Sequence, residues 1–84
     1  MHIILYTKEI CSLCDEAEAL LSAFSIEYPH TLEKRDIYSR DEWLEEYQLL
    51  IPIVEINGEQ LNCEEINYDT LEKLLRKQST EKSI

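Results

Sequence analysis

Residues 6–17 read Tyr-Thr-Lys-Glu-Ile-Cys-Ser-Leu-Cys-Asp-Glu-Ala, and this stretch decides how the rest of the chain is interpreted. The apolar run Ile3–Tyr6 leads into it and has the pattern of a strand buried on both faces. Cys11 and Cys14 follow where a helix begins, so their sulfurs lie within one helical turn. Such a pair can close a disulfide when oxidised or remain as two neighbouring thiols when reduced.

The place of Cys11 at the start of a helix favours its thiolate over its thiol. Unpaired backbone N–H groups and the positive end of the helix dipole both stabilise negative charge there, and Lys8 adds a positive charge close by. Cys14, one turn further in, is placed to displace whatever Cys11 has attacked. The simpler interpretation, two small buried hydrophobic side chains, fits this position less well.

Size and composition describe a single small acidic domain. The chain has 84 residues, with 18 Asp and Glu against 8 Lys and Arg, for a formal charge of −10. This balance argues against nucleic acid or an anionic membrane surface as a partner. We find no apolar run long enough to span a membrane and no signal peptide, and three cysteines make a poor disulfide framework for a secreted domain. We therefore expect a cytoplasmic protein and a monomer.

The first half of the chain predicts two helices around an edge strand. An amphipathic helix is expected over Ser12–Ser25, an edge strand between Glu27 and Ile37, and a short helix up to Tyr47. Ser39-Arg40-Asp41-Glu42 has the form of a capping box that opens the short helix. The side chains expected to face the core are Leu13, Ala17, Leu20, Leu21, Phe24, Trp43, Leu44 and Tyr47.

The second half predicts a hairpin and a last helix. Pro52 interrupts the most apolar segment, so a strand should start at or just after it and run to Ile56. Asn57-Gly58 predicts a tight turn, after which the chain returns over Gln60–Cys63. The expected last helix is capped by Asn67, runs from Tyr68 to about Lys77 with Tyr68, Leu71, Leu74 and Leu75 on one side, and precedes a flexible tail over residues 79–84.

The order of elements predicts an α/β fold in which helices flank a four-stranded mixed sheet. Residues 1–78 would form this one domain. A small thioredoxin-like fold has the same βαβ-α-ββ-α order. In that fold the redox pair at the start of the first helix faces a cis-proline before the third strand, and Pro52 stands at this place.

With these residues in place, the sequence resembles glutaredoxins, and more closely the compact glutaredoxin-like redoxins. Residues 6–14 are similar to the glutaredoxin segment Tyr-Thr-Lys-x-x-Cys-Pro-Tyr-Cys. Ile51-Pro52 is similar to the Val-Pro or Ile-Pro before the third strand, and Asn57-Gly58 to the hairpin after it. The resemblance covers Met1 to about Lys77. Two departures are Ser12-Leu13 between the cysteines and the absence of glycine in residues 61–65, where glutaredoxins hold glutathione.

The resemblance implies a dithiol–disulfide oxidoreductase. Cys11 would attack a disulfide, Cys14 would resolve the mixed disulfide, and the two would form a redox-active disulfide. The implied substrate is a disulfide of a protein or of a small molecule, reduced without a tightly bound cofactor, and glutathione or thioredoxin reductase would supply the electrons. The substrate-binding residues that the resemblance carries over are Lys8, the backbone of Ile51, Pro52 and Glu64.

Two other functions remain open at this point. Cys11, Cys14 and Cys63 could ligate a metal ion or iron–sulfur cluster, or a cluster could bridge two chains through Cys11 and glutathione. Alternatively, the disulfide could gate the binding of a partner without turnover. Otherwise we expect Cys63 to be a packing residue, and we see no evident partner for His2 or His30.

Overall fold

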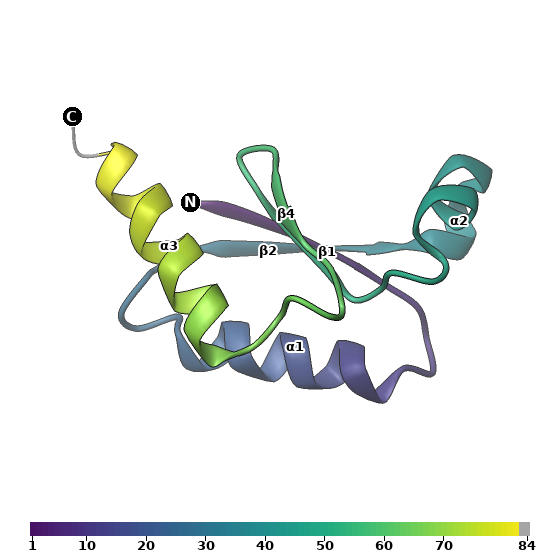
Figure 1. Cartoon of the computed structure of the whole chain (residues 1–84), viewed down its shortest axis with the longest axis horizontal. Helices are drawn as coiled ribbons and strands as arrows, with labels where there is room; N and C mark the ends of the chain where they lie inside the picture. Colours follow the sequence, from purple (N-terminus) through teal and green to yellow (C-terminus); the bar gives the residue numbers. More distant parts are fainter. Residues whose placement is uncertain (83–84) are drawn as a thin grey trace.

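The computed structural model describes the backbone of residues 1–82 and the side chains of residues 1–79. Its elements alternate as the sequence predicted, and the sheet with its flanking helices is shown in Figure 1. They are β1 (His2–Thr7), α1 (Ser12–Ala23), β2 (Thr31–Asp36), a 3₁₀ turn (Ile37–Ser39), α2 (Asp41–Tyr47), β3 (Ile53–Ile56), β4 (Glu59–Leu61) and α3 (Tyr68–Lys82). None of the described helices is both long and apolar enough to cross a bilayer.

The sheet is mixed and has the strand order β2-β1-β3-β4. β1 pairs with β2 in parallel and with β3 antiparallel, and β3 pairs antiparallel with β4. The central place predicted for the first strand and the edge place predicted for the second are therefore both confirmed. Because β1 lies in the middle of the sheet, the loop that follows Thr7 leaves from the middle of the sheet's end.

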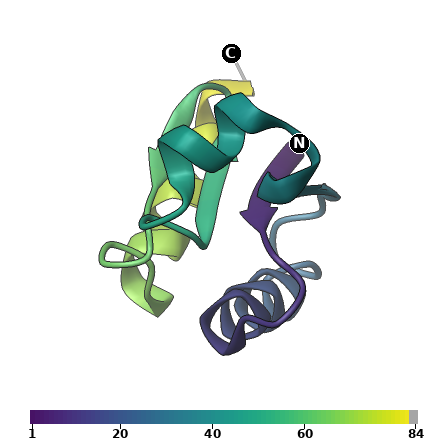
Figure 2. The same cartoon turned by 90° about the vertical axis from the view of Figure 1, so that its right-hand side faces the viewer.

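One face of the sheet is closed by α1 and α3, and it carries the larger apolar cluster (Figure 2). Strand side chains alternate between faces, so Ile3 and Leu5 of β1 and Val54 and Ile56 of β3 all point to this side. Each of these four is 0% exposed. The helices contribute Ala17, Leu21, Phe24, Leu71, Leu74 and Leu75 to the same cluster.

The opposite face is covered by α2 and is richer in aromatic and polar groups. Tyr6 of β1 is 4.5 Å from the ring of Tyr47 and 5.7 Å from that of Trp43, centroid to centroid. Arg35 of β2 lies over the rings of both Tyr6 and Trp43, at 5.6 and 5.3 Å. The core-facing role predicted for the aromatic residues of the short helix is thus confirmed.

The hairpin and the cap of the last helix form as the sequence predicts. Asn57 and Gly58 have φ of 51° and 86°, the left-handed values that a two-residue hairpin turn of this kind requires. The Asn67 side chain accepts from the backbone N–H of Thr70 at 2.9 Å, and the Thr70 hydroxyl accepts from that of Asn67.

The last helix does not end where the sequence indicated. α3 continues to Lys82, past the predicted end at about Lys77, because residues 78–82 contain no Gly or Pro that would end the helix. Residues 79–82, predicted as part of a flexible tail, are therefore helical, and residues 83–84 of that predicted tail lie outside the described part. Tyr68 is also half-exposed rather than buried, although its ring lies 4.9 Å from that of Phe24.

The predicted capping box is wrong. The Ser39 hydroxyl donates to the carbonyl oxygen of Asp36 at 2.6 Å and completes the 3₁₀ turn that precedes α2. Arg40 takes the N-cap position without a side-chain hydrogen bond. Ser39 belongs to the 3₁₀ turn and lies one residue before the N-cap, so its hydroxyl is not at the capping position, and the sequence pattern did not reveal this turn.

Leu13 also departs from its predicted place in the core. It is 55% exposed, because the first turn of α1 turns Cys14, the next residue, toward the interior instead. α1 ends at Ala23 rather than at Ser25. The buried face of α1 is supplied by Ala17 and Leu21.

Candidate functional site

Cys11 is the N-cap residue of α1. Its backbone is extended, with φ −153° and ψ 101°, and its carbonyl oxygen accepts from the N–H of Asp15 at 3.1 Å. Its sulfur takes the place of the usual capping oxygen and accepts from the backbone N–H of Cys14 at 3.2 Å. The same N–H would stabilise a thiolate on Cys11 once the protein is reduced.

Cys14 lies one turn further along α1 and is held inside the protein. The Cα atoms of the two cysteines are 5.2 Å apart, and their sulfurs are at disulfide distance. Cys14 is only 2% exposed, whereas Cys11 is half-buried. An outside molecule can therefore reach Cys11, while Cys14 can be reached only through Cys11.

An open groove of about 450 Å³ surrounds Cys11. The loop after β1 forms one side of it, and the chain between α2 and β3 forms the other, so that Lys8 and Ile51 line it together with Cys11. The Ile51–Pro52 peptide bond is cis. Pro52 lines a smaller adjoining pocket beside Leu13. The fold thus brings four of the six residues predicted for the site to one groove and its border, and Cys14 lies directly beneath.

Glu64 is the predicted site residue that the fold leaves apart. It is exposed in the loop after β4, where its backbone N–H donates to the Asn62 side chain at 2.9 Å, and it is not among the residues that line the groove. The backbone N–H of Ile51 is also engaged within the protein, since it donates to the carbonyl oxygen of Tyr47 at 3.1 Å. The binding roles of Glu64 and Ile51 stay predictions.

The sequence did not point to several residues of the groove. Ile10 and Leu49 line it and are 94% and 87% exposed, and Gln48 lies beside Leu49. Cys63, expected to pack in the interior, is half-exposed and lines both the groove and the pocket of Pro52. The available signal was the placement of apolar residues directly before Cys11 and before Pro52, but we predicted no role for Ile10 or Leu49.

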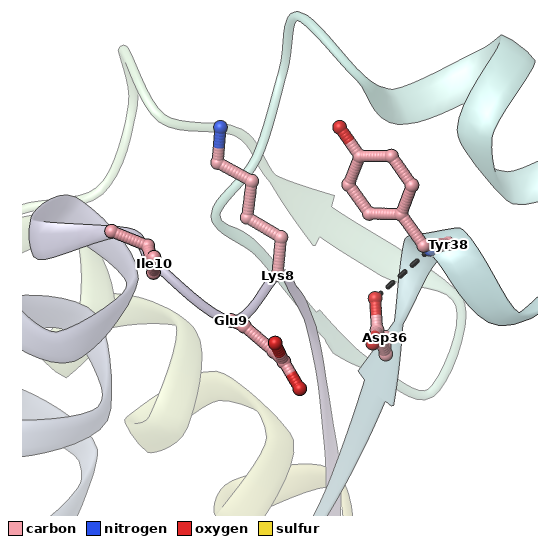
Figure 3. A pocket seen from close by; sticks show the side chains of 5 residues that line it. All are labelled: Lys8, Glu9, Ile10, Asp36 and Tyr38. Carbon is pink, nitrogen blue, oxygen red and sulfur yellow. Dashed lines mark hydrogen bonds between the residues drawn. The ribbon is translucent and has the colours of Figure 1, made fainter.

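A second cleft, of about 280 Å³, opens on the other side of the same loop (Figure 3). Lys8 and Glu9 extend to opposite sides of the loop, and Glu9 points toward the end of β2, where Asp36 lies. The Asp36 carboxylate accepts from the backbone N–H of Tyr38 at 2.9 Å. Both carboxylates also line a neighbouring pocket that contains Asp15. Acidic groups therefore border the groove on this side.

Ionisable groups on the α2 face of the sheet are linked in a row. The pKa of Tyr6 is raised, mainly because burial disfavours the phenolate, although a hydrogen bond from Arg35 at 3.1 Å opposes this effect. Arg35 also donates to Glu33, and His2 lies 2.9 Å from the same carboxylate. These two hydrogen bonds lower the pKa of Glu33, with that from Arg35 the larger cause. Through Arg35, this row of linked side chains packs against the aromatic cluster beneath α2.

The histidines differ from expectation in having partners. His2 lies 2.9 Å from the Thr31 hydroxyl and from Glu33, and His30 donates to the Tyr28 carbonyl oxygen at 2.8 Å. Across the described side chains, no three His, Cys, Asp or Glu groups are arranged to hold a metal ion.

Comparisons with known proteins agree with this architecture. A family model described as glutaredoxin-like domain (DUF836) matches residues 2–76. A solved structure of a malarial protein is 14% identical, with 92% of this chain and 94% of that chain covered and a TM-score of 0.61. The oxidised form of mitochondrial thioredoxin 3 from Saccharomyces cerevisiae is 18% identical, with 90% and 76% covered and a TM-score of 0.62. At such identities the two structures bear on the fold alone, and the predicted thioredoxin-like fold is confirmed.

Proposed function

The chain belongs to the glutaredoxin-like domain family, and from this premise we propose that it is a thiol–disulfide oxidoreductase with Cys11 as nucleophile and Cys14 as resolving thiol. Membership and fold together indicate a redox function for the cysteine pair. The proposal adds that the cysteine pair reduces an external disulfide with turnover.

One observation supports this proposal above the others. The accessible sulfur sits at the N-cap of α1 and accepts a backbone N–H, while its buried partner is at disulfide distance. A packing pair would have no reason to differ in exposure in this way. An attacking thiol must be reached from solvent, and a resolving thiol needs only to reach the first sulfur.

In the proposed reaction, the Cys11 thiolate attacks one sulfur of the substrate disulfide. A bond forms between Cys11 and that sulfur, and the other substrate sulfur leaves as a thiolate and takes up a proton. Cys14 then loses its proton and attacks the Cys11 sulfur, which forms the Cys11–Cys14 disulfide and releases the second substrate thiol. The substrate gains two electrons and two protons, and the protein becomes oxidised.

Returning the protein to the dithiol state requires two electrons from outside. We propose two glutathione molecules, which become glutathione disulfide, or a thioredoxin reductase as the donor. Comparing turnover with glutathione plus its reductase against turnover with thioredoxin reductase identifies the donor.

The decisive test uses substitutions of the two cysteines, with 2-hydroxyethyl disulfide as a small neutral substrate. Cys11→Ser should reduce the exchange rate by roughly a thousandfold or more, because the nucleophile is lost. Cys14→Ser should trap a mixed disulfide on Cys11, visible by mass spectrometry as an adduct that a thiol reductant removes. Full activity in Cys11→Ser would show that the nucleophile is wrongly assigned.

A further inference from the structure

The rim of the Cys11 groove is apolar. Ile10, Leu13 and Leu49 line the groove and are each at least half exposed, with Ile10 and Leu49 almost fully open to solvent. A single exposed leucine is ordinary on a protein surface. Three large apolar side chains around one accessible sulfur, however, form a patch that gains free energy when a partner covers it. We call these three residues the apolar rim.

For an anionic ligand the groove offers Lys8 and the N-terminal turn of α1, but not the backbone donors beside the proline. Lys8 is the one basic residue among those that line it. The two backbone donors nearest the proline are already engaged, since the N–H of Ile51 bonds to Tyr47 and that of Cys63 bonds to the carbonyl oxygen of Leu50 at 2.9 Å. A carboxylate entering the groove would therefore lose water without gaining those backbone hydrogen bonds in return.

The charge around the groove favours a cationic partner. Glu9 and Asp36 share the cleft on the other side of the loop with Lys8, and the next pocket along is lined by four acidic side chains, Asp15 among them, and two lysines. Acidic groups therefore outnumber basic ones in both. The chain as a whole carries a formal charge of −10. An acidic surface attracts basic partners and repels anions, and it also repels a second copy of this chain.

Resting on the proposed function, we infer that the groove takes a disulfide carried by a polypeptide segment, with apolar side chains next to the cystine and a basic side chain on the side of Glu9 and Asp36. The apolar side chains lie against the rim, and the basic side chain faces the acidic cleft. Glutathione disulfide, which is small and carries net negative charge, is a poor substrate. The electrons pass from the two cysteines to the segment's disulfide as in the proposed reaction.

The experiment compares short peptides, each with one cysteine linked by a disulfide to 2-mercaptoethanol. One peptide places leucines beside the cysteine and a lysine nearby, a second replaces the lysine by glutamate, and a third replaces the leucines by serines. The single-turnover rate of the fully reduced protein with each peptide is compared with that for glutathione disulfide. We expect the apolar basic peptide to react roughly tenfold faster than glutathione disulfide at low salt, and its advantage over the acidic peptide to shrink as salt rises.

Substitutions at surface residues test which side chains cause the selectivity between substrates. Leu49→Ser and Ile10→Ser should each lower the selectivity for the apolar peptide over 2-hydroxyethyl disulfide by roughly fivefold. Ile26→Ser is the matched control, because Ile26 is 92% exposed but lies just after the far end of α1. Glu9→Gln should lower the preference for lysine over glutamate by roughly twofold, whereas Glu27→Gln, also exposed and distant, should leave it unchanged.

Each result has one meaning. If glutathione disulfide reacts as fast as the apolar basic peptide, the substrate assignment is wrong, even though the oxidoreductase proposal stands. If no disulfide is reduced, the oxidoreductase proposal itself fails. If the reduced protein forms a dimer in sedimentation that Leu49→Ser abolishes, the rim binds another copy of the chain and not a substrate.

Discussion

The two faces of the sheet are built from different side chains. Under α1 and α3, the strands contribute Ile3, Leu5, Val54 and Ile56, all fully shielded and all aliphatic. Under α2, the cluster combines aromatic rings with a guanidinium, and its members include Tyr6, Tyr47, Ile51 and Cys14. The first cluster is sealed by two helices, whereas the second is covered by a seven-residue helix and open at its end.

The two clusters have different roles: the aliphatic cluster stabilises the fold, and the α2 cluster supports the site. None of the buried side chains of the aliphatic cluster lines the groove, so most of its packing can be optimised for the fold alone. The α2 cluster carries the inner cysteine and the residue before the cis-proline, so it must hold the site in place and still leave Cys11 accessible. Substitutions in the aliphatic cluster should therefore change stability and leave activity intact, and their effect on stability should exceed that of substitutions in the α2 cluster.

The largest effect on folding is expected in the aliphatic cluster. Leu5→Ala removes a fully buried side chain from the central strand, and the lost burial and the cavity should lower the free energy of unfolding by about 3 kcal/mol. Denaturant unfolding measures this change. Ile26→Ala, at an exposed position, should change it by less than about 0.5 kcal/mol.

The activity of the folded Leu5→Ala protein tests the separation of the two clusters. In the absence of denaturant, its rate with 2-hydroxyethyl disulfide should equal that of the wild type, because Leu5 lies on the opposite face from Tyr6 and Ile51. A loss of activity while circular dichroism still shows the native fold would mean that the clusters are coupled.

A smaller effect is expected from the α2 cluster. Tyr6→Phe keeps the ring but removes the hydroxyl that accepts from Arg35, which should lower the free energy of unfolding by about 1 kcal/mol at neutral pH. Because the pKa of Tyr6 is raised in the folded protein, the stability it contributes is present below about pH 10 and is lost as pH rises through its folded pKa.

The alkaline limb of the stability curve checks this assignment. Wild-type protein should lose stability above about pH 10 more steeply than Tyr6→Phe does. Tyr38→Phe serves as the control, because Tyr38 is 64% exposed and should leave the slope unchanged. Equal slopes for wild type and Tyr6→Phe would show that Tyr6 does not cause the loss of stability at alkaline pH.

The two faces also differ in how far the sequence predicted them. The unbroken apolar run in β1 and helical spacing in α1 and α3 indicated most of the aliphatic cluster, because one rule, burial of apolar side chains, decides it. The cysteine pair and Pro52 were found from their spacing and their place in the order of elements.

The rest of the site depends on tertiary geometry that no local pattern encodes. The same burial rule assigned Leu13 to the core, yet the buried side of α1 is formed by Cys14, Ala17 and Leu21 and leaves Leu13 exposed. Cys63 lines the groove only because the loop after β4 bonds back to Leu50. The row from His2 through Glu33 to Arg35 requires the register of β1 on β2, which pairs residues about 30 positions apart.

The reactivity of Cys63 tests whether its thiol lies in the open groove or in the closed core. In the oxidised protein it is the only free thiol of the three cysteines, so iodoacetamide modifies it alone. The added group lies on the groove wall. After removal of the reagent and reduction of the Cys11–Cys14 disulfide, it should slow the reaction with the apolar peptide roughly threefold by occupying part of that space. Cys63→Ser treated with the same reagent is the control. An unmodified Cys63 after prolonged exposure would place its thiol in the interior.

The smallest expected effect is at the exposed edge of the α2 face. The hydrogen bonds from Arg35 and His2 keep the pKa of Glu33 below its ordinary value. The stability that Glu33 contributes is therefore present above its unfolded pKa and is lost as pH falls through its folded pKa. Below about pH 4, the stability of Glu33→Gln should fall less steeply with decreasing pH than that of wild type. Glu46→Gln, at an exposed position, should behave as wild type does. Because the Glu33 carboxylate is open to water, the change in the slope of stability against pH should be smaller for Glu33→Gln than for Tyr6→Phe. An equally large change would mean that Glu33 is part of the buried α2 cluster and not at its border.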